Sequence, residues 1–180
     1  KFIGENYGRL FAELYGLEDE IDFHMGTFSK SLGGIGGYIC GSQEVINYVN
    51  AYARSRFFSC NVPPTIFAGL SRGLQIAIDE PHLRAKIQSN FKQMKERLIH
   101  YGVENINSQS QIIPVIIGDE DKTFSIAKRL LNEGIFVLPV VYPAVTKNKA
   151  RLRISISATL DENQIDFAAE KIASVINHLK

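Results

Sequence analysis

The residues of this 180-residue chain best suited to chemistry are Lys30 and the hydroxyl and glycine residues around it. Alternating apolar and polar residues at positions 21–25 predict a short strand just before them. Thr27 and Ser29 precede the lysine, and four glycines lie within positions 33–37. Burial of a lysine at a strand end favours its neutral amine, and a neutral amine forms an imine with an aldehyde. The segment therefore predicts covalent chemistry on Lys30.

The neighbouring residues indicate that the aldehyde carries a phosphate. Hydroxyls at Thr27 and Ser29 can donate to phosphate, and the glycines let the backbone approach a ligand closely. This combination suits a lysine that holds pyridoxal 5′-phosphate (PLP) as a Schiff base. A surface lysine in a glycine-rich turn is the alternative. The spacing excludes a P-loop, which needs glycine where Ser29 and His24 stand. It also excludes a dinucleotide fingerprint, whose third glycine is replaced by Ile39.

Longer stretches of the chain carry a family resemblance. Residues 26–32 read Gly-Thr-Phe-Ser-Lys-Ser-Leu, and Gly36-Gly37 follow. This segment resembles the cofactor-lysine segment of the α-oxoamine synthases, a PLP-dependent family. Its members include 8-amino-7-oxononanoate synthase, 2-amino-3-ketobutyrate CoA ligase, 5-aminolevulinate synthase and serine palmitoyltransferase. Similar stretches follow in the family's order over essentially the whole chain, at residues 2–6, 53–64, 137–145 and 151–158.

The resemblance implies an α/β fold, namely the C-terminal portion of a fold-type I (aspartate aminotransferase-like) PLP enzyme. Residues 1–80 would be the remainder of the PLP-binding large domain, and residues 81–180 the small C-terminal domain. The implied reaction condenses a small amino acid with an acyl-CoA, giving an α-oxoamine, CoA and usually CO₂. A family enzyme should be about twice this long, since two such domains exceed the usual single-domain size. We therefore expect a C-terminal part that is inactive alone.

The resemblance also assigns roles to individual residues. Lys30 would form the Schiff base and move the Cα proton. The Thr27 hydroxyl would bind the PLP phosphate, with Ser29 close to the same group. Ser59 would reach the phosphate of the partner subunit, which implies a homodimer with composite active sites. Arg153, the second arginine of an Arg-x-Arg motif, would bind the substrate carboxylate through its planar fork.

Each role has a simpler alternative. Thr27 and Ser29 can satisfy backbone groups at a strand end, and Ser59 can be an ordinary turn serine. Cys60 and Asn61, which follow Ser59, depart from the family's usual pairs and leave the second interface donor open. Arg153 can be an edge-strand arginine in a surface ion pair, and Arg151 we interpret as structural.

Two other functions stay open. One is a different fold-type I enzyme, such as an aminotransferase or a decarboxylase, which needs no acyl-CoA. The other is a non-catalytic scaffold subunit, and the presence of Lys30 argues against it. Neither the amino acid nor the acyl-CoA can be named from these residues, although Leu138 stands where relatives often have asparagine.

Composition narrows the partners and the location. The formal net charge is +1, so there is no electrostatic case for nucleic acid or an anionic membrane. No apolar run approaches the ~20 residues of a membrane span. Cys40 and Cys60 suggest neither a disulfide nor a metal site, and the four histidines lack ligand spacing. Reduced thiols make the cytoplasm the expected location, and we interpret His24 as a core residue.

The first half of the chain shows further local signals. Residues 37–40 predict a second strand, and Ser42 predicts the cap of a helix. Residues 57–60 read as a short extended segment. Pro63-Pro64 should open a helix that runs to about Ile78. A long amphipathic helix is predicted after a break at Pro81, ending at Gly102.

The second half predicts a strand at residues 111–117, a helix at 123–133 and a strand at 135–137. Pro114 makes the first strand an edge strand or a bulged one. Residues 151–157 alternate and predict another strand.

A final helix should begin after Asp161, which we expect to cap it. Phe167 falls off its apolar stripe. The predicted inward face holds residues at helical spacing: Ile165, Ala168, Ala169, Ile172, Val175, Ile176 and Leu179.

Overall fold

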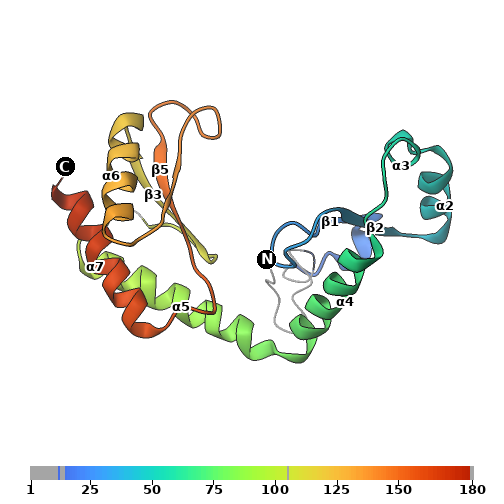
Figure 1. Cartoon of the computed structure of the whole chain (residues 1–180), viewed down its shortest axis with the longest axis horizontal. Helices are drawn as coiled ribbons and strands as arrows, with labels where there is room; N and C mark the ends of the chain where they lie inside the picture. The colour runs from blue at the N-terminus through green and yellow to red at the C-terminus, as the bar shows by residue number, and fades with distance from the viewer. Residues whose placement is uncertain (1–11, 13–14, 105, 179–180) are drawn as a thin grey trace. The chain divides into compact units, whose positions relative to one another are not determined.

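A computed structural model describes residues 12, 15–104 and 106–178 (Figure 1). The chain divides into two compact units, Lys1–Pro81 and His82–Lys180. Their assignment to the remainder of a PLP-binding domain and to a small domain stays a prediction. No helix in the described part of the chain has the length and apolarity that a membrane span requires.

The first unit is built on a two-stranded antiparallel sheet. A 3₁₀ turn, η1 (Glu18–Glu20), precedes strand β1 (Phe23–Thr27). Strand β2 (Gly37–Gly41) pairs with β1 along its whole length, so that Thr27 lies opposite Gly37. Both predicted strands are confirmed, with the first shifted by two residues. The pairing brings the two ends of the glycine-rich segment together.

Two short helices follow β2. Ser42 caps helix α2 (Gln43–Tyr52), as predicted, and its hydroxyl accepts a hydrogen bond from the Val45 N–H at 3.4 Å. Helix α3 (Arg54–Phe57) contradicts the extended segment predicted for residues 57–60. The Phe58 N–H donates to the Arg54 carbonyl at 3.0 Å, so the backbone still turns helically there.

The predicted proline-initiated helix is α4 (Pro64–Asp79). Pro64 occupies the first turn, where a backbone N–H would have no helical partner and its loss costs no hydrogen bond. Leu70, near the middle of α4, is buried. This helix supports the loop that carries Lys30.

The second unit contains a three-stranded antiparallel sheet in the order β3–β5–β4, from β3 (Ile112–Gly118), β5 (Ala150–Ser155) and β4 (Leu138–Val140). Strand β3 is an edge strand, and its register with β5 shifts between Ile116 and Gly118. Both features agree with the prediction from Pro114. The strand predicted at residues 135–137 is wrong, because residues 138–140 make the ladder with β5.

Three helices bury one face of this sheet: α5 (Pro81–His100), α6 (Glu120–Asn132) and α7 (Glu162–His178). Burial of each large aliphatic side chain stabilises the unit by about 1.5–3 kcal/mol. The shared core includes side chains from all three helices and from both longer strands: Met94, Leu98, Ile113, Val115, Ile126, Leu130, Leu152, Ile154, Ile165, Ile172 and Val175.

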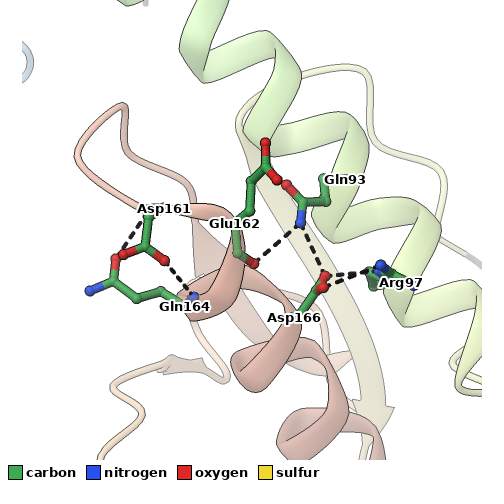
Figure 2. A network of polar contacts seen from close by, with 6 residues as sticks. All are labelled: Gln93, Arg97, Asp161, Glu162, Gln164 and Asp166. Atoms are coloured by element: carbon green, nitrogen blue, oxygen red, sulfur yellow. Dashed lines mark hydrogen bonds and ion pairs between the residues drawn. The ribbon is translucent and has the colours of Figure 1, made fainter.

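The predicted inward face of α7 is largely confirmed. Ala168 is only half-buried, Ala173 is an additional buried residue, and Phe167, which falls off the stripe, is exposed. Leu179 lies outside the described residues. Asp161 caps the helix by accepting a hydrogen bond from the Gln164 N–H at 2.8 Å, and Gln164 Oε1 accepts from the Asp161 N–H at 3.0 Å (Figure 2). The reciprocal pair is a capping box.

One buried polar residue, Asn90 on α5, ties the helix to the segment between β5 and α7. Its side-chain amide donates to the carbonyls of Ser157 and Leu160, both at 2.9 Å. Two carbonyl acceptors fix which end of the amide carries the nitrogen. The remaining oxygen, Oδ1, is buried and has no partner among the described residues.

A polar network joins α5 to α7 (Figure 2). Asp166 accepts from Gln93 Nε2 at 3.0 Å and from both Arg97 Nε at 2.8 Å and Arg97 Nη2 at 3.2 Å. The hydrogen bond from Gln93 is the main cause that lowers the pKa of Asp166, and the bonds and charge of Arg97 act in the same direction against burial. Both charged side chains are partly exposed, so water weakens the pair.

The lowered pKa of Asp166 gives a pH dependence of stability. The ionised Asp166 carboxylate stabilises the folded state fully above its unfolded-state pKa. This stabilisation is lost as the pH falls through the lower folded-state pKa. Asp166→Asn should therefore melt at a lower temperature than the wild type at neutral pH, and the difference should shrink as the pH falls below the ordinary pKa of aspartate. Melting curves followed by circular dichroism measure this. Glu170→Gln, which removes the same charge from α7, is the control. An Asp166→Asn deficit that is unchanged at acid pH would contradict the assignment.

Candidate active site

The Lys30 segment is a closed loop between β1 and β2. The Phe28 N–H donates to the Gly36 carbonyl, and the Gly34 N–H donates to the Phe28 carbonyl, both at 3.0 Å. Gly33 and Gly36 have φ angles of 65° and 91°, which side chains with a Cβ rarely adopt. These hydrogen bonds and conformations hold the loop closed directly after Thr27.

Helix α4 supports this loop from one side. The Phe28 ring meets the Phe67 ring edge-on, with centroids 6.5 Å apart. A Cβ added to Gly34 would lie 2.7 Å from Leu70 Cδ2, so the loop backbone approaches the helix too closely for a side chain. With these contacts on one side, the side chains of residues 29–31 remain exposed.

The predicted cofactor residues form a chain of hydrogen bonds. The hydroxyls of Thr27 and Ser29 are 2.9 Å apart, and Lys30 Nζ donates to Ser29 Oγ at 3.2 Å. Thr27 Oγ1 also accepts from the Ser29 N–H at 3.3 Å and donates to the Gly36 carbonyl at 3.4 Å. The structure thus brings together one amine and two hydroxyl groups, as the sequence predicted.

One expectation about Lys30 is wrong. The sequence predicted a buried strand end beside it, but Lys30 is exposed, and so are Phe23, Met25 and Thr27 on β1. The physical reason is that β1 and β2 form a sheet of only two strands in the described part of the chain. His24, expected in the core, is half-buried.

Ser59 is exposed, and its hydroxyl donates to the Ser55 carbonyl one helical turn back. Within the described residues, no hydrogen bond joins Ser59 to Thr27, Ser29 or Lys30. This is the local geometry of a turn serine, and a role toward a second subunit stays a prediction.

Arg153 belongs to the second unit, on the central strand β5. Its neighbours in sequence, Leu152 and Ile154, are buried, whereas Arg153 is exposed on the opposite sheet face, as the alternation predicted. Its guanidinium makes no hydrogen bond or ion pair within the described part of the chain. Arg151 differs, because its Nε donates to the Lys149 carbonyl at 3.0 Å. A planar donor fork without an internal partner can bind a carboxylate.

The cross-strand neighbours of Arg153 did not follow from the sequence. Pro114 on β3 and Leu138 on β4 lie directly opposite Arg153. The alternation of apolar and polar residues predicts which side chains share a face of the sheet. Which residues lie opposite each other also depends on the turns and on the bulge in β3.

Metal ligation finds no support in the described residues, which contain no group of three His, Cys, Asp or Glu side chains able to hold an ion. Cys40 and Cys60 are exposed free thiols.

Comparison with known proteins shows the family. Residues 2–172 match the aminotransferase class I and II family. The chain is 39% identical to serine palmitoyltransferase of Sphingobacterium spiritivorum, over 96% of this chain and 43% of that protein. It is 36% identical to 8-amino-7-oxononanoate synthase of Thermoanaerobacter pseudethanolicus, over 97% of this chain and 45% of that protein. The chain therefore spans less than half the length of these curated relatives.

A solved serine palmitoyltransferase with a PLP internal aldimine superposes with a TM-score of 0.91 at 27% identity, covering 99% of this chain and 45% of that one. This similarity confirms the predicted fold class, part of a fold-type I PLP enzyme, and PLP is the cofactor of that relative. The chain belongs to the aminotransferase class I and II family, and its relatives there are the α-oxoamine synthases that its sequence resembles.

Proposed function

We propose that this chain supplies the cofactor lysine and the carboxylate-binding arginine of a PLP-dependent acyltransferase. The enzyme condenses a small amino acid with an acyl-CoA, forming an α-oxoamine and releasing CoA and usually CO₂. The observation that carries the proposal is the hydrogen-bonded group of Thr27, Ser29 and Lys30 on a closed loop. The identity to both a serine palmitoyltransferase and 8-amino-7-oxononanoate synthases supports the reaction class.

The residues fit the chemistry of PLP. An amine suits its aldehyde, and two hydroxyl donors suit its phosphate. The backbone that closes the loop beside Thr27 is closely packed: a Cβ on Gly37 would lie 2.6 Å from the Gly26 carbonyl oxygen, and one on Gly36 would lie 2.5 Å from Val62 Cγ2. Exposure of the hydroxyls and of Lys30 leaves them open to a ligand.

When bound, PLP supplies an electron sink for the bonds at the amino-acid Cα. Lys30 Nζ would hold the cofactor and would carry the Cα proton as base and acid. Ser29 accepts a hydrogen bond from Nζ and so positions the amine. Thr27 would donate to the phosphate, with Ser29 beside it, and Arg153 would hold the substrate carboxylate.

The proposal extends to assembly and location. The complete enzyme acts as a homodimer in which Ser59 serves the partner's phosphate, and its partners are an amino acid and an acyl-CoA. Residues 1–80 belong to the PLP-binding domain and residues 81–180 to the small domain. The chain alone is inactive. A cytoplasmic location agrees with the two free thiols.

The match to the aminotransferase class I and II family favours one alternative, an aminotransferase or decarboxylase on the same scaffold. Such an enzyme consumes an amino acid without a thioester. Release of CoA from a panel of acyl-CoAs, measured with and without amino acid, separates the two reactions. Amino-acid turnover with no acyl-CoA present would favour the alternative.

Covalent attachment tests the role of Lys30. Borohydride reduction of the PLP-loaded complete enzyme, followed by peptide mapping, should find a pyridoxyl group on Lys30, because its amine lies beside the phosphate-binding hydroxyls. Lys30→Ala should retain none. A pyridoxyl group on a different lysine would remove Lys30 from the site.

Mixed dimers test the role of Ser59. Lys30→Ala and Ser59→Ala enzymes, each impaired alone, should form heterodimers with one intact site, because Lys30 of one subunit then meets Ser59 of the other. Activity at limiting PLP should rise above that of the separate variants. No gain, despite heterodimers shown by native mass spectrometry, would place Ser59 in its own subunit's site or outside any site.

Substrate affinity tests the role of Arg153. Arg153→Ala should retain PLP but bind the amino acid more weakly by about 1.5–3 kcal/mol, the usual worth of a charge-assisted hydrogen bond. That corresponds to a roughly ten- to hundredfold larger Kd, measured from the absorbance change on titration. Arg153→Lys should rescue poorly, because an ammonium lacks the planar fork.

Arg151→Ala is the matched control, since Arg151 lies on the same strand and sheet face. It should leave the amino-acid Kd within about twofold. A lower melting temperature with unchanged affinity in Arg153→Ala would show that Arg153 is a scaffold residue.

A further inference from the structure

On the open face of the β3–β5–β4 sheet, the two arginines of β5 have different cross-strand neighbours. Arg153 lies between Pro114 and Leu138, whereas Arg151 lies between Ile116 and Val140. Directly opposed residues in an antiparallel ladder place their Cβ atoms about 4.5–5.5 Å apart on one face. The two side chains that flank Arg153 are therefore both apolar, and neither carries a hydrogen-bond acceptor.

We propose that Leu138 is a positioning residue that keeps the Arg153 guanidinium free for the substrate carboxylate and shields the pair from water. This inference rests on the proposed role of Arg153. It adds a specificity determinant on strand β4 to the proposed site.

Two physical effects act together at Leu138. A polar residue directly opposite Arg153 would offer the guanidinium an acceptor and hold its donors within the protein. A leucine offers none, which agrees with the absence of any partner for Arg153 in the described residues. Its side chain would also displace water on one side of the bound carboxylate, and an ion pair strengthens as the surrounding dielectric falls.

Leu138 itself is 45% exposed, so its exposed atoms border the same open face as Arg153. The neighbouring arginine provides the contrast within one strand. Arg151 already donates to the Lys149 carbonyl, so part of its fork is occupied. Val140, its cross-strand neighbour on β4, is apolar as well but shorter than leucine. Leu138 and Val140 thus form a matched pair, with the same strand, the same face and an arginine opposite each.

The test compares carboxylate with amide ligands in the complete PLP-loaded enzyme. Glycine, L-alanine and L-serine are each titrated against the corresponding amide, and the absorbance change gives each Kd. The ratio of the amide Kd to the amino-acid Kd measures carboxylate selection, since both ligands share the same amine and side chain. Comparing this ratio between variants removes the intrinsic difference between the two ligands.

Leu138→Asn, a nearly isosteric change, should lower the ratio by about three- to tenfold, because the new side-chain oxygen competes for the fork. Val140→Thr, the matched isosteric control beside Arg151, should change it by less than about twofold. Leu138→Ala removes most of the side chain without adding an acceptor, so it should lower the ratio less than Leu138→Asn does. It tests the same role if Leu138→Asn misfolds. Circular dichroism confirms folding in each case.

The outcomes separate this inference from the function on which it rests. If Arg153→Ala abolishes carboxylate selection but Leu138→Asn and Leu138→Ala keep the wild-type ratio, the role of Leu138 is overturned and the proposed function stands. If Arg153→Ala itself keeps the ratio, the carboxylate-binding role of Arg153 fails first. An equal loss in Val140→Thr and Leu138→Asn would assign the effect to the sheet as a whole and overturn the inference.

Discussion

The closed backbone of residues 28–36 is the constraint on which the candidate cofactor site depends. Two backbone hydrogen bonds at its base and the positive φ angles of Gly33 and Gly36 fix the path of the chain. Helix α4 contacts this loop through Phe28 and Gly34, whereas the side chains of residues 29–31 remain exposed. Because Thr27 ends β1 and Lys30 lies within this loop, one local structure positions the amine and both hydroxyls. The hydrogen bonds that join these groups all lie within residues 27–36, and α4 supports the loop from one side.

The second unit positions Arg153 by a different principle. Strand β5 alternates between a face that three helices bury and a face that stays open, so the same residues that build the core determine where the arginine lies. Leu152 and Ile154 anchor the strand on either side of it. Asn90 then ties the segment after β5 to α5 through two carbonyl groups. The packing that buries Leu152 and Ile154 in the core therefore also places the Arg153 guanidinium on the open face.

Signals that act over a few residues predicted most of the fold. Ser42, Pro64 and Asp161 mark helix starts because each satisfies or removes an N–H that the first turn cannot pair. The two failures have different origins, a long-range strand pairing in one case and local helical hydrogen bonds in the other. Residues 135–137 have the composition of a strand, but the ladder with β5 forms three residues later. Residues 57–60 begin with two phenylalanines, yet α3 continues to Phe57 through its own backbone hydrogen bonds.

The candidate site shows the same division between local and long-range information. Spacing alone could place two hydroxyls beside Lys30, because residues one and three positions apart on one loop stay close in any compact conformation. It could not reveal that Leu138 faces Arg153, since that pairing depends on the register of two strands whose partners are 15 positions apart in sequence. It also could not identify Asn90, whose acceptors lie 67 and 70 residues away. Candidate site residues on a single loop can therefore be predicted from sequence, whereas the neighbours of an arginine across a sheet require the structure.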